Sequence, residues 1–349
     1  MAKSAKDVAI QVGSFTVAGL LMWLALRGVD FNAVVTSLAQ ANYWWLLPIV
    51  IVTLLSHWLR AVRWSLFLDA TTASNAATPA NDVAAPVSRT NAFASVMVGY
   101  MANYAGPRLG EIIRTANVAR QEKRPFSTVL GTVVIERLLD MVTFGLLLLT
   151  LPLVFADQIG DLWTLLTAPT QSWIEASSGV VLIGLLVALV IGGGAGIWFL
   201  IRGINNPSSR LGALAEHFRE GMLSLLRTGK PVQITAYTIG MWICYGFMAW
   251  LPFILLGQHL TFDIGLIAAW GLMLIGAFGV IIPSPGGIGT YHFITIQSLA
   301  LLFSMPQADA AAYALLTHTG QMIIYIAAGF FGLLFMGNKL TATTPPNES

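Results

Sequence analysis

Long apolar runs dominate the 349 residues of this chain, and they restrict the folds that it can adopt. An α-helix needs about 20 predominantly apolar residues to cross the roughly 30 Å hydrocarbon core of a bilayer. Only 10% of the residues are charged, against about 25% in soluble domains. The sequence therefore predicts an all-α integral membrane protein, formed by one domain over residues 1–349. Full transmembrane helices are predicted at about 8–26, 46–68, 126–155, 178–201, 231–256 and 309–336.

Two further apolar segments, 91–120 and 262–303, are interrupted by glycine and proline. Both residue types end helices, because proline lacks the N–H and glycine readily adopts left-handed dihedral angles. At membrane depth, broken backbone is tolerated only where protein or a wet cavity satisfies its polar groups. Each segment therefore predicts a re-entrant helical hairpin whose break lines a cavity. The breaks contain Gly106 and Pro107 in the first hairpin, and Pro283, Pro285 and Gly289 in the second.

The basic residues predict how the chain is oriented. Lys and Arg collect on the cytoplasmic side of membrane proteins, and nearly all 18 fall on one side if each hairpin returns to the side from which it enters. We therefore expect a multi-pass protein of the cytoplasmic (inner) membrane, with both termini cytoplasmic. In that arrangement the halves at about 46–155 and 231–336 run in opposite directions, as an inverted repeat. Interrupted segments in two inverted halves are typical of the midplane site of a transporter.

Two segments lie outside this repeat. Residues 69–90 are rich in Thr, Ala, Asn and Pro, a composition that predicts a cytoplasmic loop. Residues 205–228 carry apolar side chains at helical spacing opposite charged ones. This pattern predicts an amphipathic cytoplasmic helix on the inner leaflet.

Three ionisable residues, Glu136, Arg137 and Asp140, lie near the centre of the predicted helix 126–155. Each costs about 2.5–3.5 kcal/mol at a helix centre on insertion scales, so such groups face protein, water or one another. At these spacings the side chains share a helix face and can partly neutralise one another. The cluster has two interpretations, as a structural charge network or as a group that contacts substrate or couples a proton.

The first break is a candidate anion site. Its second arm begins near Arg108 and continues through Glu111 and Arg114 on one flank, while Asn103 lies in the turn. The N-terminus of a helix attracts anions, and arginine can bind phosphate through two parallel hydrogen bonds. A phosphate headgroup fits this pattern. Arg108 as the counter-ion of the acidic residues at 136 and 140 is an equal and compatible interpretation.

Arg60 and Arg63 end the second predicted span at the cytoplasmic side, next to Trp64. Arginine and tryptophan at this level are often interfacial anchors, with charged ends that reach water. The alternative interpretation is a cationic site that admits anionic lipid headgroups.

The second break combines glycine with a titratable residue. Gly286 and Gly287 let a headgroup or the opposing hairpin approach the backbone, and His292 follows shortly after them. Histidine is the side chain that titrates nearest to neutral pH. His57 and His318 lie within spans, where we expect histidines that pack between helices.

The motifs of soluble enzymes and of metal sites are absent from the sequence. It contains no GxSxG, P-loop or HExxH motif, and Cys244 is its single cysteine, which excludes an intrachain disulfide or cysteine metal site. We expect no cofactor and no metal, and a net charge of +2 gives no reason to expect binding to nucleic acid. A membrane-embedded enzyme that uses Glu136, Asp140 or His292 remains an alternative.

Four short motifs follow one another along the chain: Arg60-Ala-Val-Arg63-Trp64, Gly110-Glu111-Ile-Ile-Arg114, Glu136-Arg137-Leu-Leu-Asp140 and Pro283-Ser-Pro285-Gly286-Gly287-Ile-Gly289. In this order and spacing they resemble the transmembrane region of lysylphosphatidylglycerol synthases, a flippase-like membrane family that also has stand-alone members. The resemblance implies an inner-membrane protein that moves an aminoacylated phospholipid, a polyprenyl-linked lipid or another lipid between leaflets. The family commonly places an acidic residue after its second glycine motif, where this chain has Tyr291 and His292. The resemblance therefore leaves the substrate open.

We expect the protein to flip or scramble an anionic or aminoacylated phospholipid, or a polyprenyl-linked lipid, across the cytoplasmic membrane. The chain ends at Ser349 without an aminoacyl-transferase domain, so we do not expect it to synthesise lysyl-lipid. Two other functions agree with the same residues, namely a membrane-embedded enzyme acting on lipid headgroups and a scaffold of an envelope-lipid complex. The expected ligand is a membrane lipid with a phosphate headgroup. The expected protein partner is either a second copy of the chain, in a homodimer, or an envelope-synthesis protein.

Overall fold

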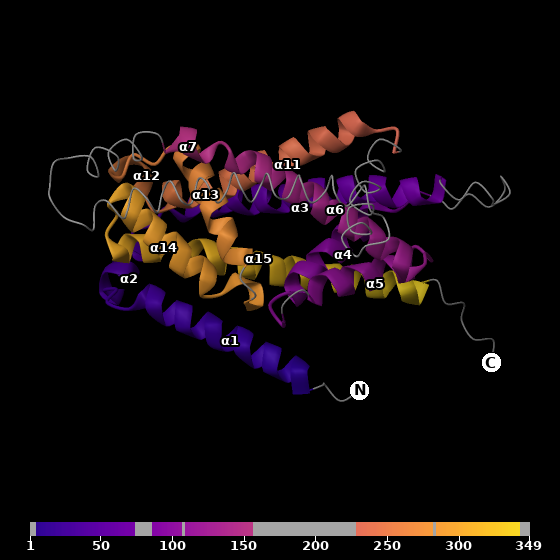
Figure 1. The fold of residues 1–349 in the computed structure, drawn as a ribbon, viewed down its shortest axis with the longest axis horizontal. Coiled ribbons are helices and arrows are strands. Elements are labelled where there is room, and N and C mark those ends of the chain that lie inside the picture. Colours follow the sequence, from indigo (N-terminus) through magenta and orange to yellow (C-terminus); the bar gives the residue numbers. More distant parts are fainter. Residues whose placement is uncertain (1–4, 74–85, 107–108, 156–227, 282–283, 343–349) are drawn as a thin grey trace, which may run out of the picture. The chain divides into compact units, whose positions relative to one another are not determined.

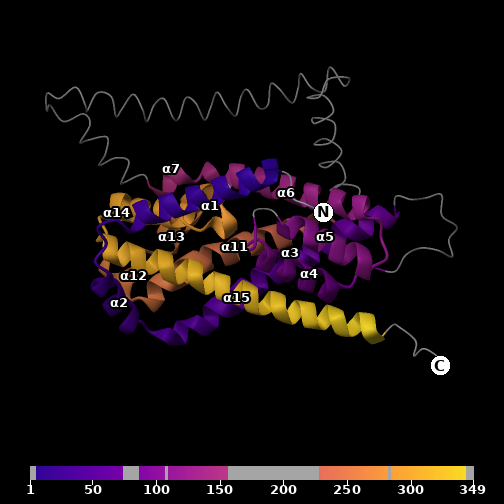
Figure 2. The ribbon, with the colours of Figure 1, turned by 90° about the horizontal axis from the view of Figure 1, so that it is seen from below.

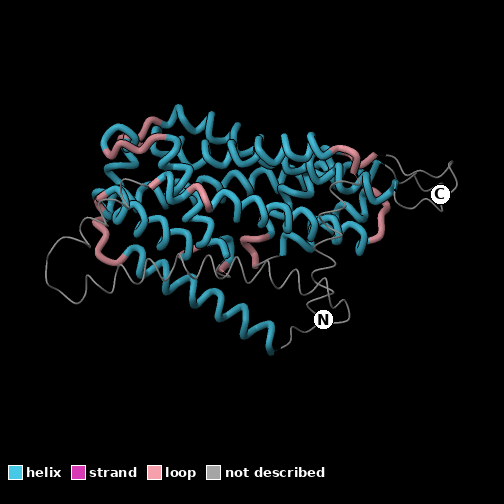
Figure 3. The backbone as a smooth tube through the Cα atoms, turned by 45° about the horizontal axis from the view of Figure 1, so that its top comes forward, coloured by secondary structure: helices cyan, strands magenta, loops and turns pink. Residues whose placement is uncertain are grey.

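The structure, a computed structural model, describes residues 5–73, 86–106, 109–155, 228–281 and 284–342. Within these ranges every regular element is a helix and no strand occurs (Figure 1 and Figure 3). The prediction of an all-α protein is therefore confirmed. The chain divides into two compact units, one formed by Met1–Glu136 with Lys230–Ser349 and the other by Arg137–Gly229. The site described below lies in the first unit.

The described helices occur along the chain in the following order. The part of the chain before residue 156 contains α1 (Ala5–Leu26), α2 (Phe31–Ala39), η1 (Tyr43–Trp45), α3 (Leu46–Ala73), α4 (Arg89–Ala102), α5 (Leu109–Gln121), α6 (Phe126–Leu148) and α7 (Leu151–Val154). The part after residue 227 contains α11 (Pro231–Leu255), α12 (Gln258–Thr261), α13 (Leu266–Ile281), η3 (Pro285–Gly287), α14 (Thr290–Phe303) and α15 (Gln307–Ala342).

The described residues contain four helical segments that are long and apolar enough to cross a membrane. The pair α1 and α2, bent by 84°, makes a fifth if it is counted as one span. The predicted span 178–201 and almost all of the predicted amphipathic helix 205–228 lie outside the described residues. The described residues therefore contain fewer than the expected six spans. The four segments are Tyr43–Thr71, Phe126–Val154, Pro231–Leu255 and Gln307–Gly337.

The bounds of one predicted loop were wrong. The loop predicted at 69–90 begins later, because α3 continues to Ala73 and α4 already begins at Arg89. Asp69 on α3 accepts a hydrogen bond from the backbone N–H of Val87 at 2.8 Å, which fixes the returning chain against the helix. The span predicted at 126–155 agrees with the apolar segment Phe126–Val154, although the regular helix has a short break after Leu148. Pro152 lies in the first turn of the short α7 that follows, a position that proline tolerates because the N–H there needs no partner.

Both interrupted segments form pairs of helices that pack against each other, α4 on α5 and α13 on α14. In the first pair, a Cβ atom at Gly99 would lie 2.9 Å from the carbonyl oxygen of Gly110. In the second pair, a Cβ atom at Gly279 would lie 3.0 Å from the Cα of Tyr291. The same kind of contact, a glycine of the first arm against the backbone of the second arm, therefore recurs in both pairs.

Close packing around Trp64 fixes the helices that carry the site. α3 lies along α11, and α15 lies along α4 (Figure 2). Helices in lipid gain no hydrophobic driving force by associating, so their association depends on packing and hydrogen bonds. The fully buried Trp64 belongs to a core cluster from α3, α4, α5 and α6. Its other buried members are Ala61, Leu68, Val87, Ala92, Val96, Val118, Val129 and Val133.

Candidate functional site

A buried carboxylate lies among arginines of two other helices. Glu136 on α6 is fully buried, and its Oε1 lies 2.5 Å from Nη1 of Arg60 and 3.6 Å from Nη2 of Arg63, both on α3. Its Oε2 lies 2.9 Å from Nη1 of Arg114 on α5. Each arginine is at most 5% exposed. We call these four residues the arginine cluster.

Helical spacing explains why two arginines of α3 reach one carboxylate. Arg60 and Arg63 are three residues apart, so they share one face of the helix. The next residue, Trp64, donates a hydrogen bond from Nε1 to Oγ1 of Thr132 on α6 at 2.9 Å. The guanidinium carbon of Arg114 lies 4.9 Å from the centre of the Trp64 ring, which is cation–π geometry. Trp64 thus holds α5 and α6 against α3 at the level of the carboxylate.

Two hydrogen bonds connect the arginine cluster to α11. Arg63 donates from Nη1 to Oγ1 of Thr238 at 3.0 Å, and Arg60 donates from Nη2 to the phenolic oxygen of Tyr245 at 3.0 Å. The burial of both arginines does not agree with their interpretation as interfacial anchors, whose charged ends would reach water. They are fixed inside the helix bundle instead.

The arginine cluster contains more positive than negative charge. Arginine stays protonated in proteins, so three guanidinium groups face one carboxylate, a formal excess of two positive charges among these four side chains. The sequence predicted partial neutralisation within residues 136–140, and the structure adds ion pairs from Glu136 to arginines of other helices. A planar guanidinium matches phosphate oxygens through paired hydrogen bonds. The arrangement is therefore suited to an anionic ligand.

Asn103 closes the turn between α4 and α5. Its Oδ1 accepts a hydrogen bond from the backbone N–H of Gly110, in the first turn of α5, at 2.9 Å. The sequence predicted that backbone N–H groups at this helix start bind an anion, but the N–H of Gly110 is already used by Asn103. Gly106 is buried in the turn, and Glu111 is partly buried in the first turn of α5. Pro107 and Arg108, which were part of the prediction, lie outside the described residues.

The second break is a short turn that requires glycine at its centre. Gly286 in η3 has φ of 60°, in the left-handed region that side chains disfavour. The hydroxyl groups of Ser284 and Thr290 lie 3.0 Å apart and close the turn. The carbonyl oxygen of Gly286 lies 2.9 Å from Nε2 of His318 on α15. The turn is therefore fixed from within and from the last long helix.

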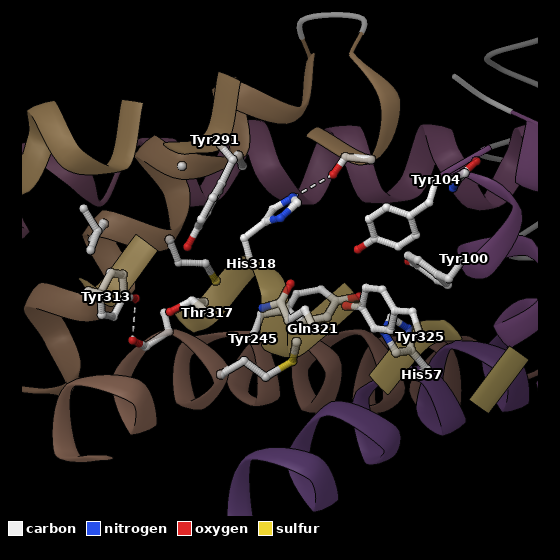
Figure 4. Close-up of a pocket in the computed structure, with 18 residues that line it drawn as sticks. His57, Tyr100, Tyr104, Tyr245, Tyr291, Tyr313, Thr317, His318, Gln321 and Tyr325 are labelled. Carbon is white, nitrogen blue, oxygen red and sulfur yellow. Dashed lines mark hydrogen bonds between the residues drawn. The ribbon is translucent and has the colours of Figure 1, made fainter. Parts of the chain in front are cut away.

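The two breaks touch, and a cavity lies beside their contact. A Cβ atom at Gly286 would collide with the ring of Tyr104, in the first break, so the ring lies directly on this backbone. The cavity has a volume of about 310 Å³ and is bordered by both breaks and by α3, α11, α13 and α15 (Figure 4). Six of the eight tyrosines of the chain line it. Its polar lining consists of Tyr100, Tyr104, Tyr245, Tyr291, Tyr313, Tyr325, His57, Asn103, Thr317, His318 and Gln321.

The cavity adjoins the arginine cluster. Tyr245, which lines the cavity, accepts the hydrogen bond from Arg60. His57 also lines the cavity and lies on α3 one turn before Arg60. The cavity lining and the arginine cluster are therefore joined directly through Tyr245.

Several other predicted site residues do not line this cavity. His292 is 2% exposed, and its ring lies 4.7 Å from the ring of His318, between centroids. Gly289 packs against the backbone of Ala18, so the second break also supports α1. Pro285 and Gly287 are buried in η3, whereas Pro283 lies outside the described residues. Arg137 and Asp140 follow on α6 in the second compact unit.

Sequence reasoning missed most of the cavity. His57 and His318 were expected to be packing histidines, and the tyrosines were not singled out. A signal existed, because tyrosine in membrane proteins is enriched at the interfaces, whereas Tyr245 and Tyr325 lie well inside long apolar helices. In the part of the chain that the structure describes, no three histidine, cysteine or acidic side chains are grouped as a metal site requires.

Comparisons with known proteins agree with the architecture. The family model described as the lysylphosphatidylglycerol synthase TM region matches residues 11–329. The UPF0104 membrane protein MJ1078 of Methanocaldococcus jannaschii is 25% identical over 246 residues, which are 69% of this chain and 95% of that protein. No solved structure matches the chain. The match of the family model over nearly the whole length shows that this multi-pass membrane protein belongs to the family of the lysylphosphatidylglycerol synthase transmembrane region.

Proposed function

We propose that this protein flips or scrambles an anionic or aminoacylated phospholipid, or a polyprenyl-linked lipid, across the cytoplasmic membrane. One observation carries the proposal: three buried arginines around Glu136 adjoin a cavity at the contact of two broken helical segments. The arginines suit a phosphate, and the cavity suits the rest of a headgroup. The acyl or prenyl chains of the transported lipid remain in the hydrocarbon core of the bilayer.

The energetics of a headgroup in hydrocarbon explain why such a site is needed. An isolated ion moved into a medium of low dielectric constant costs on the order of tens of kcal/mol by idealised estimates. Charge-assisted hydrogen bonds from Arg60 or Arg114 to a phosphate would offset much of this cost. Glu136 then serves as the internal anion that keeps the guanidinium groups paired between successive headgroups. Its contact with Arg60 would lengthen when phosphate binds.

The two broken segments support transport rather than a purely structural role. In many transporters, discontinuous helices from two inverted halves form the substrate site near the bilayer midplane. We assign this role to the pairs α4–α5 and α13–α14, as re-entrant hairpins of the halves 46–155 and 231–336. Their contact through Tyr104 and Gly286, beside a shared cavity, supports this assignment.

Family membership supports a lipid-related role, because the family model is described as the transmembrane region of a lysylphosphatidylglycerol synthase. In the proposed mechanism both termini are cytoplasmic, as the distribution of basic residues predicts. Arg137 and Asp140 balance the charge of the site or couple movement to a proton. A homodimer or an envelope-synthesis partner is compatible with this mechanism and is not required by it.

Reconstitution tests the proposal. Full-length protein is placed in liposomes that contain a tail-labelled anionic or aminoacyl lipid, and chemical quenching of the outer leaflet reports exchange. We expect faster exchange than in protein-free liposomes and than in liposomes with an unrelated membrane protein at the same ratio. No acceleration with any of these lipids, by protein with an intact melting transition, would contradict the proposal. A new lipid product in the extracts would instead indicate a membrane enzyme.

A further inference from the structure

We infer that the cavity binds a neutral, hydroxyl-rich headgroup, a sugar or polyol joined to the phosphate that the arginine cluster holds. The inference rests on the proposed function and narrows its substrate class. It selects a glycosylated or polyol-bearing lipid phosphate over an aminoacylated one and over a bare lipid phosphate.

The first support is the chemistry of the cavity lining. No Asp, Glu, Lys or Arg is found among the described residues that border the cavity. The polar lining consists of phenol, hydroxyl, amide and imidazole groups, each of which can both donate and accept hydrogen bonds. Sugar hydroxyl groups also donate and accept. Neutral groups on both sides avoid the cost of burying an uncompensated charge.

The second support is an orphaned polar side chain. His57 lines the cavity and is 1% exposed, and neither of its ring nitrogens has a hydrogen-bond partner among the described residues. Buried polar groups in native proteins are nearly always hydrogen-bonded, so an unsatisfied one points to a partner such as a ligand. A ligand hydroxyl can satisfy either nitrogen, because it can donate to one and accept from the other.

The third support is the arrangement of aromatic rings around His57. The ring centroids of His57 and Tyr100 are 4.3 Å apart, and those of Tyr100 and Tyr325 are 5.0 Å apart. Figure 4 shows Tyr100, Tyr104 and Tyr325 together on the side of the cavity near His57. Tyrosine presents an apolar ring face and a polar hydroxyl. A sugar ring has the same division, with C–H groups on its faces and hydroxyl groups at its edge.

The position of the cavity places the hydroxyl-rich part next to the phosphate. His57 and Arg60 are three residues apart on α3, about 4.5 Å along the helix axis at 1.5 Å per residue. A phosphate at Arg60 and the ring attached to it can span this separation. Tyr245 contacts both sites, since it lines the cavity and accepts a hydrogen bond from Arg60.

The same observations disfavour an aminoacyl headgroup. Aromatic faces attract ammonium groups, but no carboxylate borders the cavity in the described part of the chain. Arg60 donates directly to the cavity-lining Tyr245 at 3.0 Å, so a positive charge adjoins the space that an ammonium would occupy. An acyl chain in the cavity would leave His57 unsatisfied. A phosphate alone would occupy the arginines and leave the polar lining unused.

Binding of soluble headgroup analogues tests the inference separately from transport. The full-length protein in detergent is melted with glucose 1-phosphate, inorganic phosphate or phosphoethanolamine at equal concentrations. We expect glucose 1-phosphate to raise Tm most. His57→Phe and Tyr104→Phe each remove hydrogen-bonding atoms and keep a ring, so each should weaken glucose 1-phosphate binding about threefold to tenfold. Binding of inorganic phosphate should stay unchanged.

Matched controls remove the same atoms elsewhere. Tyr43→Phe removes an exposed hydroxyl that donates to the carbonyl of Leu38, and His259→Phe removes a histidine outside the cavity. Neither should change the preference for glucose 1-phosphate. Equal stabilisation by all three compounds, or a preference that survives both His57→Phe and Tyr104→Phe, would overturn the inference.

Liposome exchange identifies the source of the headgroup and separates the two proposals. The arms are phosphatidylinositol, a polyprenyl phosphoglucose, phosphatidic acid and lysylphosphatidylglycerol, all at one protein-to-lipid ratio. Faster exchange of phosphatidylinositol or of the polyprenyl phosphoglucose than of the other two lipids supports the inference. Whichever of these two exchanges faster identifies the lipid class that supplies the headgroup. Exchange without headgroup preference overturns the inference and leaves the proposed function standing. Selective binding of glucose 1-phosphate without exchange of any lipid supports the headgroup site and contradicts translocation.

Discussion

The ring of Tyr104, in the turn after α4, lies on the backbone of Gly286, in the turn before α14. This contact joins the two broken segments of the chain. The carbonyl of Gly286 is held in addition by the imidazole of His318 at 2.9 Å. Because all three residues line the cavity, the contact between the breaks also forms part of the cavity wall. The geometry of the proposed headgroup site therefore depends on this contact.

Gly286→Ala should destabilise the protein and distort the cavity. The left-handed φ of 60° at this position costs a side-chain-bearing residue roughly 1–2 kcal/mol, and the new Cβ would also collide with Tyr104. We expect a lower Tm in detergent and slower lipid exchange. Gly320→Ala on α15 is the control, because no heavy atom lies within 4 Å of a Cβ there and its Tm should not fall. If the Gly286→Ala variant had the same Tm as the wild type, the contact between Tyr104 and the backbone of Gly286 would be contradicted.

Glu136→Gln should destabilise the protein strongly. The substitution keeps the shape of the side chain and removes the anion that Arg60, Arg63 and Arg114 share. Removing one partner of a buried ion pair typically costs about 3–5 kcal/mol. Thermal melting in detergent measures the effect, and Asp263→Asn in an exposed turn is the control. Equal melting temperatures for the two variants would show that the carboxylate is not needed to hold the arginines.

Arg114→Lys should be only partly tolerated. Lysine keeps the positive charge near Glu136 but loses the planar group that lies over the Trp64 ring at 4.9 Å. Exposed cation–π contacts contribute about 0.5–1 kcal/mol and desolvated ones about 2 kcal/mol. We expect a destabilisation within this range, measured by thermal melting, and slower exchange of an anionic lipid. Arg120→Lys, at an exposed position in the last turn of α5, should leave both quantities at their wild-type values.

Gly110→Ala should separate the arms of the first broken segment. A Cβ atom there would meet the backbone carbonyl of Gly99 and lie 2.7 Å from Oδ1 of Asn103, so the hydrogen bond that closes the turn would also be disturbed. Overpacking of this kind typically costs about 1–3 kcal/mol. Gly131→Ala on α6 meets no atom within 4 Å and is the matched control. Similar melting temperatures for the two alanine variants would argue against the close approach of α4 and α5.

The helices and the breaks were predictable because their signals are local. Apolar length indicated α3, α11 and α15, and glycine with proline indicated the turns near Gly106 and Gly286. The ends of helices were less predictable. Asp69 fixes the chain after α3 through a hydrogen bond to Val87, and no local composition encodes such a contact.

The partners of the charged residues could not be predicted in the same way. Glu136 was singled out because a charge inside an apolar helix is costly. Its ion pairs join positions that lie far apart along the sequence, Arg60 and Arg114, and depend on how the helices pack. The cavity was missed for the same reason, since His57 and Tyr325 come together only through the packing of α3 and α15. The one indication of the cavity in the sequence was the central position of Tyr245 and Tyr325 within apolar helices.

The rate at which the Arg60→Gln variant exchanges an anionic lipid between leaflets is the most direct test of a headgroup site at the arginine cluster. Arg60 contacts both Glu136 and the cavity-lining Tyr245, while Arg63 and Arg114 still pair with the carboxylate in the variant. Proteoliposomes with wild type, Arg60→Gln and the control Arg120→Gln are compared at one protein-to-lipid ratio, after melting confirms that each is folded. We predict rapid exchange by wild type and Arg120→Gln, and exchange at least about tenfold slower by Arg60→Gln, the effect of about 1.4 kcal/mol. If the wild type exchanged lipid no faster than protein-free liposomes do, a lipid headgroup site at the arginine cluster would be contradicted. Equal exchange rates for wild type and Arg60→Gln would contradict it as well.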